Sequence, residues 1–363
     1  MGGITGWLFF FNEFLTYTGF ALLSFAAFLY LLFPSLSTIR YSWVALALIP
    51  LAFTTILVYR GIRVSLDYAV YTGFIEVSVL TVGALLIIAR LGTANTLEVF
   101  TTAPVHGKLS LIGLGLLFGL YSYGGSGSVV ALGEEARDPN KTISKSIIYG
   151  WLLIVAPLAL NAYALTVGWG INNMSSFATS PDPGVIEYFR YLGAVGGWIF
   201  VAVVINSFLD FGIAINNSLT RMLYYLARDT AILPKFLSRT HPRFGTPKNA
   251  VLTVALASLA IAILSGELFG PFMGALVIEG AASIAFMLQH FFATVALPFY
   301  AKRNKTLDLA RHVVIPSAAI ILMAFAIMST VYPIPAYPLN LPAYIVTAWA
   351  LLGLFLVVKR QKI

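Results

Sequence analysis

Apolar residues run along the chain in ten long stretches that short polar segments separate. A transmembrane helix needs about 17–25 predominantly apolar residues, and each of these stretches is long enough to cross a bilayer. The pattern therefore predicts an all-α protein with ten membrane-spanning helices and no soluble domain. The expected helices are 5–33, 41–59, 66–91, 109–136, 145–170, 192–227, 249–265, 268–300, 312–332 and 341–358.

The polar segments on the two sides of the predicted membrane differ in charge. Eighteen of the 22 Lys and Arg residues lie at the ends of, or directly after, the second, fourth, sixth, eighth and tenth helices. The other four are Arg40, Arg90, Lys108 and Arg190. Cytoplasmic loops are enriched in Lys and Arg, so this asymmetry predicts that both termini are cytoplasmic. The longest outer loop is then 171–190.

Composition supports a multi-pass membrane protein. Hydrophobic residues make up 59% of the 363 residues and charged residues 10%, with a mean hydropathy of +0.89. Soluble domains carry about 25% charged residues, so that class is excluded. The net charge of +8 does not indicate a nucleic-acid partner, because the basic residues lie between the apolar stretches, where topology requires them. The absence of cysteine excludes disulfides, thiolate metal sites and cysteine nucleophiles.

The fourth apolar stretch contains a glycine-rich interruption. It consists of Gly124, Gly125, Ser126 and Gly127. Glycine costs a helix about 1 kcal/mol relative to alanine, so the helix is expected to unwind here. In a membrane, unwound backbone persists only where it lines a protein cavity or water. From spacing alone, close helix packing through Gly115 and Gly119 is an equally good explanation of the glycines.

Two longer motifs favour the unwound helix. The run 121–143, YSYGGSGSVVALGEEARDPNKTI, resembles the sixth helix and following loop of the amino acid–polyamine–organocation (APC) permease superfamily. The run 216–251, NNSLTRMLYYLARDTAILPKFLSRTHPRFGTPKNAV, resembles the signature that follows the eighth helix of that family. GWLFFFNEF, at 6–14, is more weakly similar to the third helix. The resemblance covers essentially the whole chain.

The resemblance implies a LeuT-type fold with inverted repeats, in which substrate binds where broken helices meet near the membrane midplane. The glycine interruption lies in the sixth helix of the family but in the fourth apolar stretch here. We therefore expect 1–91 to be the remnant of the first repeat, without its first two helices, 109–300 to be the second repeat, and 312–358 to be two accessory helices. The expected substrate-binding residues are Tyr17, Tyr121, Tyr123, Gly124, Gly125, Ser126 and Gly127.

Ionisable residues within a membrane span are costly and are functional candidates by default. Four carboxylates lie within the predicted helices: Glu13, Glu76, Asp210 and Glu279. The resemblance places Glu76 near a lysine of proton-coupled relatives, and Asp210 on a helix that supplies ion ligands in sodium-coupled relatives. We expect Glu76, Asp210 and Ser207 to be candidates for coupling to H⁺ or Na⁺. Glu13 and Glu279 are expected to be structural hydrogen-bonding groups.

Three charged residues are candidates for a cytoplasmic gate. Glu134 and Glu135 end the interrupted helix, and Arg221 lies near the end of the sixth helix on the same predicted side. An ion pair between them would close the inner side of the protein. An ordinary solvated surface pair, worth under about 1 kcal/mol, is the alternative.

These features together predict a secondary transporter of amino acids or related amines in the cell membrane, coupled to protons or working by exchange. The alternative is a non-transporting permease remnant or a partner subunit. No HExxH motif, aspartate pair or Ser/His cluster lies within a span, so we expect neither an enzyme nor a metal or organic cofactor. The expected partners are the substrate and the lipid bilayer, and the sequence leaves the oligomeric state open.

Overall fold

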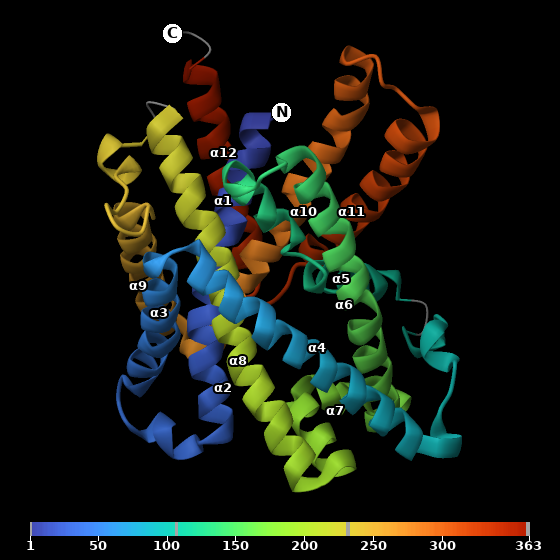
Figure 1. The fold of residues 1–363 in the computed structure, drawn as a ribbon. Helices are drawn as coiled ribbons and strands as arrows, with labels where there is room; N and C mark the ends of the chain where they lie inside the picture. The colour runs from blue at the N-terminus through green and yellow to red at the C-terminus, as the bar shows by residue number, and fades with distance from the viewer. Residues whose placement is uncertain (1, 106–107, 230–232, 361–363) are drawn as a thin grey trace.

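The protein is an assembly of long helices, and the part of the chain that the structure describes contains no strand (Figure 1). The computed structural model describes residues 2–105, 108–229 and 233–360, without the side chains at 2, 104, 109, 114 and 356–360. The α-helices are α1 (Gly2–Thr16), α2 (Phe25–Leu32), α3 (Ser42–Arg60), α4 (Ile62–Leu91), α5 (Leu109–Ser122), α6 (Pro139–Trp169), α7 (Met174–Thr179), α8 (Pro183–Asp229), α9 (Lys248–Phe269), α10 (Pro271–Arg303), α11 (Ile315–Val331) and α12 (Leu341–Arg360).

Shorter 3₁₀ and π segments connect these helices. Two of them are π-helical, namely η1 (Tyr17–Ser24), which lies between α1 and α2, and η9 (Ala310–Val314). The 3₁₀ segments are η2 (Pro34–Thr38), η3 (Gly92–Ala94), η4 (Glu98–Phe100), η5 (Ala103–Val105), η6 (Ser126–Glu135), η7 (Ile171–Asn173) and η8 (Lys235–Ser238).

Eight helical stretches of the described chain are long and apolar enough to cross a membrane, and each corresponds to one of the ten predicted helices. The other two predictions are also found as helical structure. Residues 341–358 lie in α12, and residues 109–136 are divided between α5 and η6. The all-α prediction is confirmed.

One boundary was predicted wrongly. Part of the expected outer loop 171–190 is helical, because α7 lies within it and α8 begins at Pro183 rather than at 192. The cause is visible at Gly193, which interrupts α8 with φ 70° and ψ −172°. The apolar pattern therefore predicted the long part of α8 after Gly193 but not the short part before it.

The longest-range packing joins the two ends of the chain to α10. α1 and α12 both pack on α10, and the indole rings of Trp7 and Trp349 stack with 4.3 Å between their centroids. Each indole N–H donates to the backbone carbonyl of the other residue, at 2.9 and 3.2 Å. Ala281, Ala282 and Ala285 are fully buried on α10, so the neighbouring backbones can approach closely.

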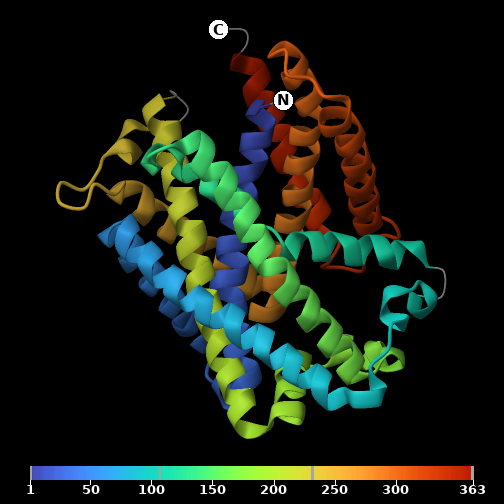
Figure 2. The same cartoon turned by 45° about the vertical axis from the view of Figure 1, so that its right-hand side comes forward.

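A second group of helices consists of α4, α6 and α8. Tyr188 of α8 fits against Gly83 of α4, where an added Cβ would lie 2.5 Å from the tyrosine ring. The Tyr188 hydroxyl donates to Asn161 of α6 at 2.7 Å, so one side chain contacts all three helices. α5 packs on α11 and α10, and Figure 2 shows it lying across the direction of α1.

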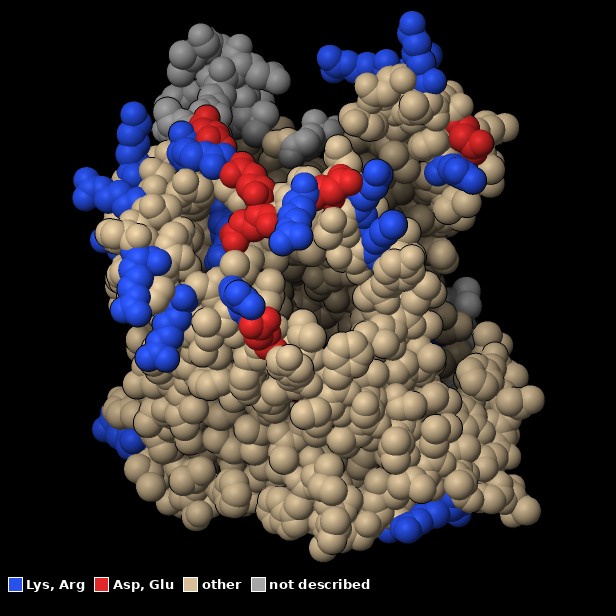
Figure 3. All heavy atoms as spheres, in the orientation of Figure 1, with Lys and Arg blue, Asp and Glu red and all other residues tan. Residues whose placement is uncertain are grey.

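The start of α1 and the end of α12 lie at the same end of the molecule (Figure 1). Most of the Lys and Arg side chains visible in Figure 3 gather over that half, which we call the basic end. Lys362, which the sequence placed in the cytoplasm, lies outside the described residues. The shared position of the chain ends agrees with an even number of spans, and the side of the membrane that they face stays a prediction.

Candidate functional site

The glycine interruption separates α5 from η6. Tyr123, Gly124 and Gly125 lie between the two helical segments, whereas Ser126 and Gly127 already belong to the 3₁₀ stretch. Gly125 has φ +93°, a left-handed conformation that side chains with a Cβ rarely adopt. A Cβ on Gly124 would lie 2.8 Å from the Tyr121 carbonyl oxygen and 3.0 Å from the Phe286 ring. Both glycines are therefore required by the local geometry, while Gly115 and Gly119 have nothing within 4 Å of an added Cβ.

The residues on both sides of this break contact α1. Ser128 of η6 donates to Glu13 Oε1 at 2.9 Å, and the Glu13 side chain is only 2% exposed. On the other side of the break, the Tyr121 hydroxyl lies 2.7 Å from Thr16 Oγ1 and donates to Glu279 Oε2 at 3.0 Å. The break is thus held between α1 and α10.

Two of the predicted substrate-binding tyrosines have different surroundings. Tyr17 has no exposed surface, and its hydroxyl lies 2.7 Å from Thr54 Oγ1 and accepts from Asn216 at 3.3 Å. The ring centroid of Tyr123 lies 5.8 Å from that of Trp151 on α6. A contact of these residues with substrate stays a prediction.

The three predicted coupling residues lie together between α4 and α8. Glu76 Oε1 accepts from Asn206 Nδ2 at 2.7 Å, and Glu76 Oε2 accepts from Ser207 at 2.8 Å. Asn206 Nδ2 also donates to Asp210 Oδ2 at 3.3 Å. One amide therefore connects the two carboxylates, and we call this group the coupling cluster.

Two residues of α4 complete the coupling cluster. Thr72 donates to Asp210 Oδ2, and the Tyr68 hydroxyl donates to Asn206 Oδ1 at 2.5 Å. Neither residue was predicted from the sequence. Tyr68, Thr72 and Glu76 are spaced four residues apart and so lie on one face of α4. That spacing is the signal that would have found them.

The coupling cluster contains two acidic groups and no basic one. No Lys, Arg or His of the described chain forms an ion pair with Glu76 or Asp210. Asp210 Oδ1 is buried and lacks a hydrogen-bond partner. The role of these two carboxylates in binding a coupling ion stays a prediction. Within the described residues, no group of three or more His, Cys, Asp or Glu side chains could hold a metal ion.

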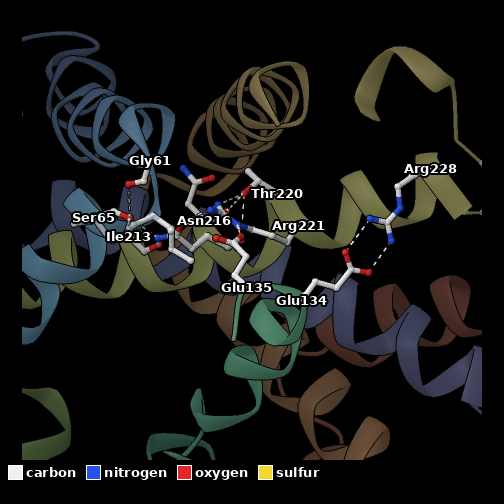
Figure 4. Close-up of polar contacts among 11 residues, drawn as sticks. Gly61, Ser65, Glu134, Glu135, Ile213, Asn216, Thr220, Arg221 and Arg228 are labelled. Atoms are coloured by element: carbon white, nitrogen blue, oxygen red, sulfur yellow. Dashed lines mark hydrogen bonds and ion pairs between the residues drawn. The ribbon is translucent and has the colours of Figure 1, made fainter. Parts of the chain in front are cut away.

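The predicted gate residues form ion pairs at the basic end (Figure 4). Arg221 Nε donates to Glu135 Oε1 at 2.8 Å, and Arg221 Nη1 donates to Asn217 Oδ1 at 2.8 Å. Arg228, which was not predicted from the sequence, binds Glu134 through two hydrogen bonds of 2.8 and 2.6 Å. These hydrogen bonds lower the pKa of Glu134 below its ordinary value. Both pairs join η6 to α8.

The two ion pairs differ in burial. The Arg221 side chain is 4% exposed, whereas the Arg228 side chain is 36% exposed and the Glu134 side chain 55%. A pocket with a volume of about 340 Å³ opens beside both pairs, and its lining includes Glu134, Glu135, Arg221, Tyr224, Tyr225 and Arg228. The basic end therefore has a polar pocket directly at the residues that tie η6 to α8.

Comparisons with known proteins identify what the chain is similar to. A family model described as amino acid permease matches residues 1–357. An uncharacterized transporter of Mycobacterium tuberculosis is 31% identical over 211 residues, which cover 56% of this chain and 45% of the relative. The low-affinity putrescine importer PlaP of Escherichia coli is 27% identical over 226 residues, or 60% of this chain and 46% of the importer. Cationic amino acid transporter 5 of Arabidopsis thaliana is 28% identical over 149 residues, or 40% and 25%.

The chain covers less than half the length of each of these three relatives. The family match and the all-helical structure together confirm the predicted LeuT-type fold class. The division of the chain into 1–91, 109–300 and 312–358 as repeats and accessory helices stays a prediction.

Proposed function

We propose that this chain, which belongs to the amino acid permease family, is a secondary transporter that moves amino acids or related amines across the cell membrane. The observation that carries the proposal is the break between α5 and η6. Its unwound backbone at Tyr123, Gly124 and Gly125 lies among helices long enough to span a membrane, where non-helical backbone persists only when it is buried in protein or lines a water-filled cavity. Broken helices of this kind bind substrate in secondary transporters.

The start of η6 is suited to a negatively charged substrate group. The first N–H groups of a helix have no partner within that helix, and its dipole favours an anion there. η6 is ten residues long and begins at Ser126, directly after the break. A substrate carboxylate would bind at Gly125, Ser126 and Gly127.

Two relatives indicate which substrates to test first. The names of the putrescine importer and of the cationic amino acid transporter both specify compounds with amino groups. Amines and basic amino acids are therefore our first candidates, with neutral amino acids as the comparison.

Within this proposal, the coupling ion is the proton. Three of the four carboxylate oxygens of Glu76 and Asp210 accept hydrogen bonds from Asn206, Ser207 or Thr72, so the groups that point at them are donors. Sodium needs several free oxygen ligands, and here only Asp210 Oδ1 lacks a donor. A proton shared between the carboxylates requires no further ligand. The alternate protonation states would change the attraction between α4 and α8.

The ion pairs at the basic end act as the inner gate of the transporter. They connect η6, which follows the break, to α8, which carries Asp210 of the coupling cluster. Separation of Arg221 from Glu135 would release η6 and open a path from the break toward the basic end. We assign that end to the cytoplasm because it holds most of the Lys and Arg residues.

Uptake into liposomes tests the proposal. The protein would be reconstituted together with any helices that its gene encodes before residue 1, and uptake of radiolabelled putrescine, lysine and leucine measured with an inward proton gradient, a sodium gradient or neither. Saturable uptake that the proton gradient raises is expected, and Gly125→Leu should abolish it. Absence of saturable uptake for every substrate would contradict the proposal and favour a non-transporting subunit.

A further inference from the structure

Side chains of α4 and α8 form hydrogen bonds at three levels along the two helices. The bonded pairs are Glu76 with Ser207, Thr72 with Asp210, and Ser65 with Asn217. Each step toward the N-terminus of α4 is matched by a step toward the C-terminus of α8, so the two helices run antiparallel in this region. The first two pairs belong to the coupling cluster, whereas the third pair lies outside it.

The pair of Ser65 with Asn217 lies two helical turns from the coupling cluster. Ser65 precedes Thr72 by seven residues on α4, and this interval corresponds to roughly 10 Å along the helix axis. Asn217 follows Asp210 by the same interval on α8. Both intervals are uninterrupted α-helix, and residues seven apart lie on one helix face. Because rigid helices carry displacements along their length, a movement of α4 against α8 at the coupling cluster also moves Ser65 against Asn217.

The Asn217 side chain also holds the buried arginine of the gate. Its Oδ1 atom accepts from Arg221 Nη1 at 2.8 Å. Its Nδ2 group donates to Ser65 Oγ and to the Ile213 carbonyl oxygen, both at 3.0 Å. A guanidinium group only donates, so the amide must face Arg221 with its oxygen and Ser65 with its nitrogen. Asn217 and Ser65 have no exposed surface, so they form these contacts away from solvent.

Ser65 belongs to the first turn of α4, beside the gate. Its hydroxyl donates to the backbone carbonyl oxygens of Gly61 at 3.2 Å and Ile62 at 3.0 Å, so its oxygen is left to accept from Asn217 (Figure 4). Ile62 lines the same pocket as Arg221. The start of α4 and the buried ion pair of the gate are therefore neighbours, and Asn217 bonds to both.

We infer that Asn217 is the positioning residue that transmits a displacement of α4 against α8 to Arg221, and thereby connects the coupling cluster to the gate. The inference rests on the proposed transport function and states how the gate of that transporter is controlled. While Ser65 accepts from Asn217, the amide keeps one orientation and its oxygen holds Arg221 beside Glu135. When α4 moves away, the amide loses this contact and turns, and Arg221 loses the acceptor that orients it.

A single cysteine on η6 measures the opening of the gate. Ala131 is buried on η6, between the break and Glu135, so the thiol of Ala131→Cys should react with a maleimide only when η6 is released. Its rate would be measured in unsealed membrane fragments, relative to the exposed thiol of Ser144→Cys. Glu76→Gln keeps that side chain uncharged and so keeps α4 against α8. It should lower the relative rate about fivefold, the low end of typical coupling between two sites.

Two further variants interrupt the connection. Ser65→Ala removes the acceptor on α4 and leaves the contact of Asn217 with Arg221 in place, whereas Asn217→Leu has a similar shape but neither donates nor accepts. In either background, Glu76→Gln should change the relative rate less than twofold. A role in stability alone would change the rate by the same factor with Glu or Gln at position 76, because the effects of independent sites add.

The matched control is Ser258→Ala, at a buried serine of α9 whose hydroxyl has no hydrogen-bond partner among the described residues. This variant should keep the fivefold response to Glu76→Gln. The melting temperature of each variant would be measured in parallel, and Ser65→Ala decides the test if Asn217→Leu does not fold.

A full fivefold response to Glu76→Gln in the Ser65→Ala background would overturn the inference. So would a rate for Ala131→Cys that is equal with Glu and Gln at position 76, because no displacement would then reach the gate. Saturable uptake alongside either result would leave the transport function intact. Absence of saturable uptake would contradict the transport function, whichever labelling result accompanies it.

Discussion

The side-chain amide of Asn206 donates a hydrogen bond of 2.7 Å to Glu76 Oε1 and thereby joins α8 to α4. The same amide group donates to Asp210 Oδ2 at 3.3 Å. A change in the protonation of one carboxylate therefore alters the hydrogen bonding and electrostatic environment of the other. Loss of a proton from this pair leaves two negative charges around one amide, which favours separation of the two helices. We therefore predict that the protonation of the coupling cluster influences the relative position of α4 and α8.

We expect Glu76→Gln to reduce proton-driven accumulation by roughly 5- to 150-fold, the range of typical coupling free energies. In one orientation of its side-chain amide, glutamine can form hydrogen bonds with both Asn206 and Ser207. It cannot, however, bind and release a proton as a carboxylate does. Uptake by the variant should lose most of its dependence on external pH, while substrate affinity changes little. The measurement is initial uptake rate against pH in liposomes.

The control for this experiment is Glu98→Gln, which removes an exposed carboxylate in η4. It should leave the pH profile as in the wild type. A Glu76→Gln variant that keeps the full pH profile would show that Glu76 is a structural hydrogen-bonding group.

The sequence was informative about the coupling cluster because charges inside apolar helices are rare. Glu76 and Asp210 stand out in their helices for that reason, and Ser207 was named as their neighbour on α8. Thr72 and Tyr68 were missed because hydroxyl groups are common in membrane helices, and only the pairing of α4 with α8 shows which of them meet the carboxylates. Helix pairing is a long-range property that apolar periodicity does not contain.

The same distinction applies to the gate residues and to Glu13 and Glu279, the two other carboxylates within the predicted helices. Glu134, Glu135 and Arg221 were predicted because the acidic and basic residues follow recognisable motifs. Glu13 and Glu279 were expected to be structural hydrogen-bonding groups, and nothing in the linear sequence shows that Ser128 and Tyr121 are their partners. Burial and hydrogen bonding at that level depend on the packing of α1 against α10.

Substitution of Gly125 tests the break itself. Gly125 adopts φ +93°, so Gly125→Ala should lower stability by about 1–2 kcal/mol and weaken substrate binding, because the strained backbone shifts the start of η6. Gly119→Ala is the matched control, since an added Cβ there would have nothing within 4 Å and its φ is ordinary. Melting temperature and substrate affinity would be measured for both. Equal behaviour of the two variants would show that the left-handed residue is not needed at the break.

Single cysteines test the orientation in the membrane. The chain has no cysteine, so Ser175→Cys in α7 and Ser144→Cys in α6 each introduce one exposed thiol, at opposite ends of the molecule. With the basic end in the cytoplasm, a membrane-impermeant maleimide added to intact cells should label position 175 and not position 144. Lysed cells, in which both positions should react, provide the control. The reverse labelling pattern would place both chain ends outside the cell.

The two ion pairs of the gate should contribute unequally. Arg221 is buried and holds both Glu135 and Asn217, so Arg221→Gln should cost roughly 1.5–3 kcal/mol of stability, the value of hydrogen bonds to a charged group. Arg228→Gln removes an exposed ion pair whose hydrogen bonds water can replace, so the loss of stability should be smaller. Melting temperatures of the two variants, compared with that of Arg243→Gln in the adjacent loop, give the ranking. Equal losses would show that burial does not determine the strength of the gate.

Acidic pH should weaken the more exposed of the two ion pairs, the one between Arg228 and Glu134. Because the hydrogen bonds from Arg228 lower the pKa of Glu134, the contact is fully stabilising above the ordinary pKa of a glutamate. The stabilisation is lost as pH falls through the lowered pKa, when the Glu134 carboxylate gains a proton. A thiol introduced as Thr240→Cys, on the wall of the adjacent pocket, should therefore react faster with maleimide at strongly acidic pH, relative to an exposed reference thiol such as Ser144→Cys. Glu134→Gln should show the faster relative rate at every pH. A relative rate in the wild type that does not change with pH would show that this ion pair does not limit access to the pocket.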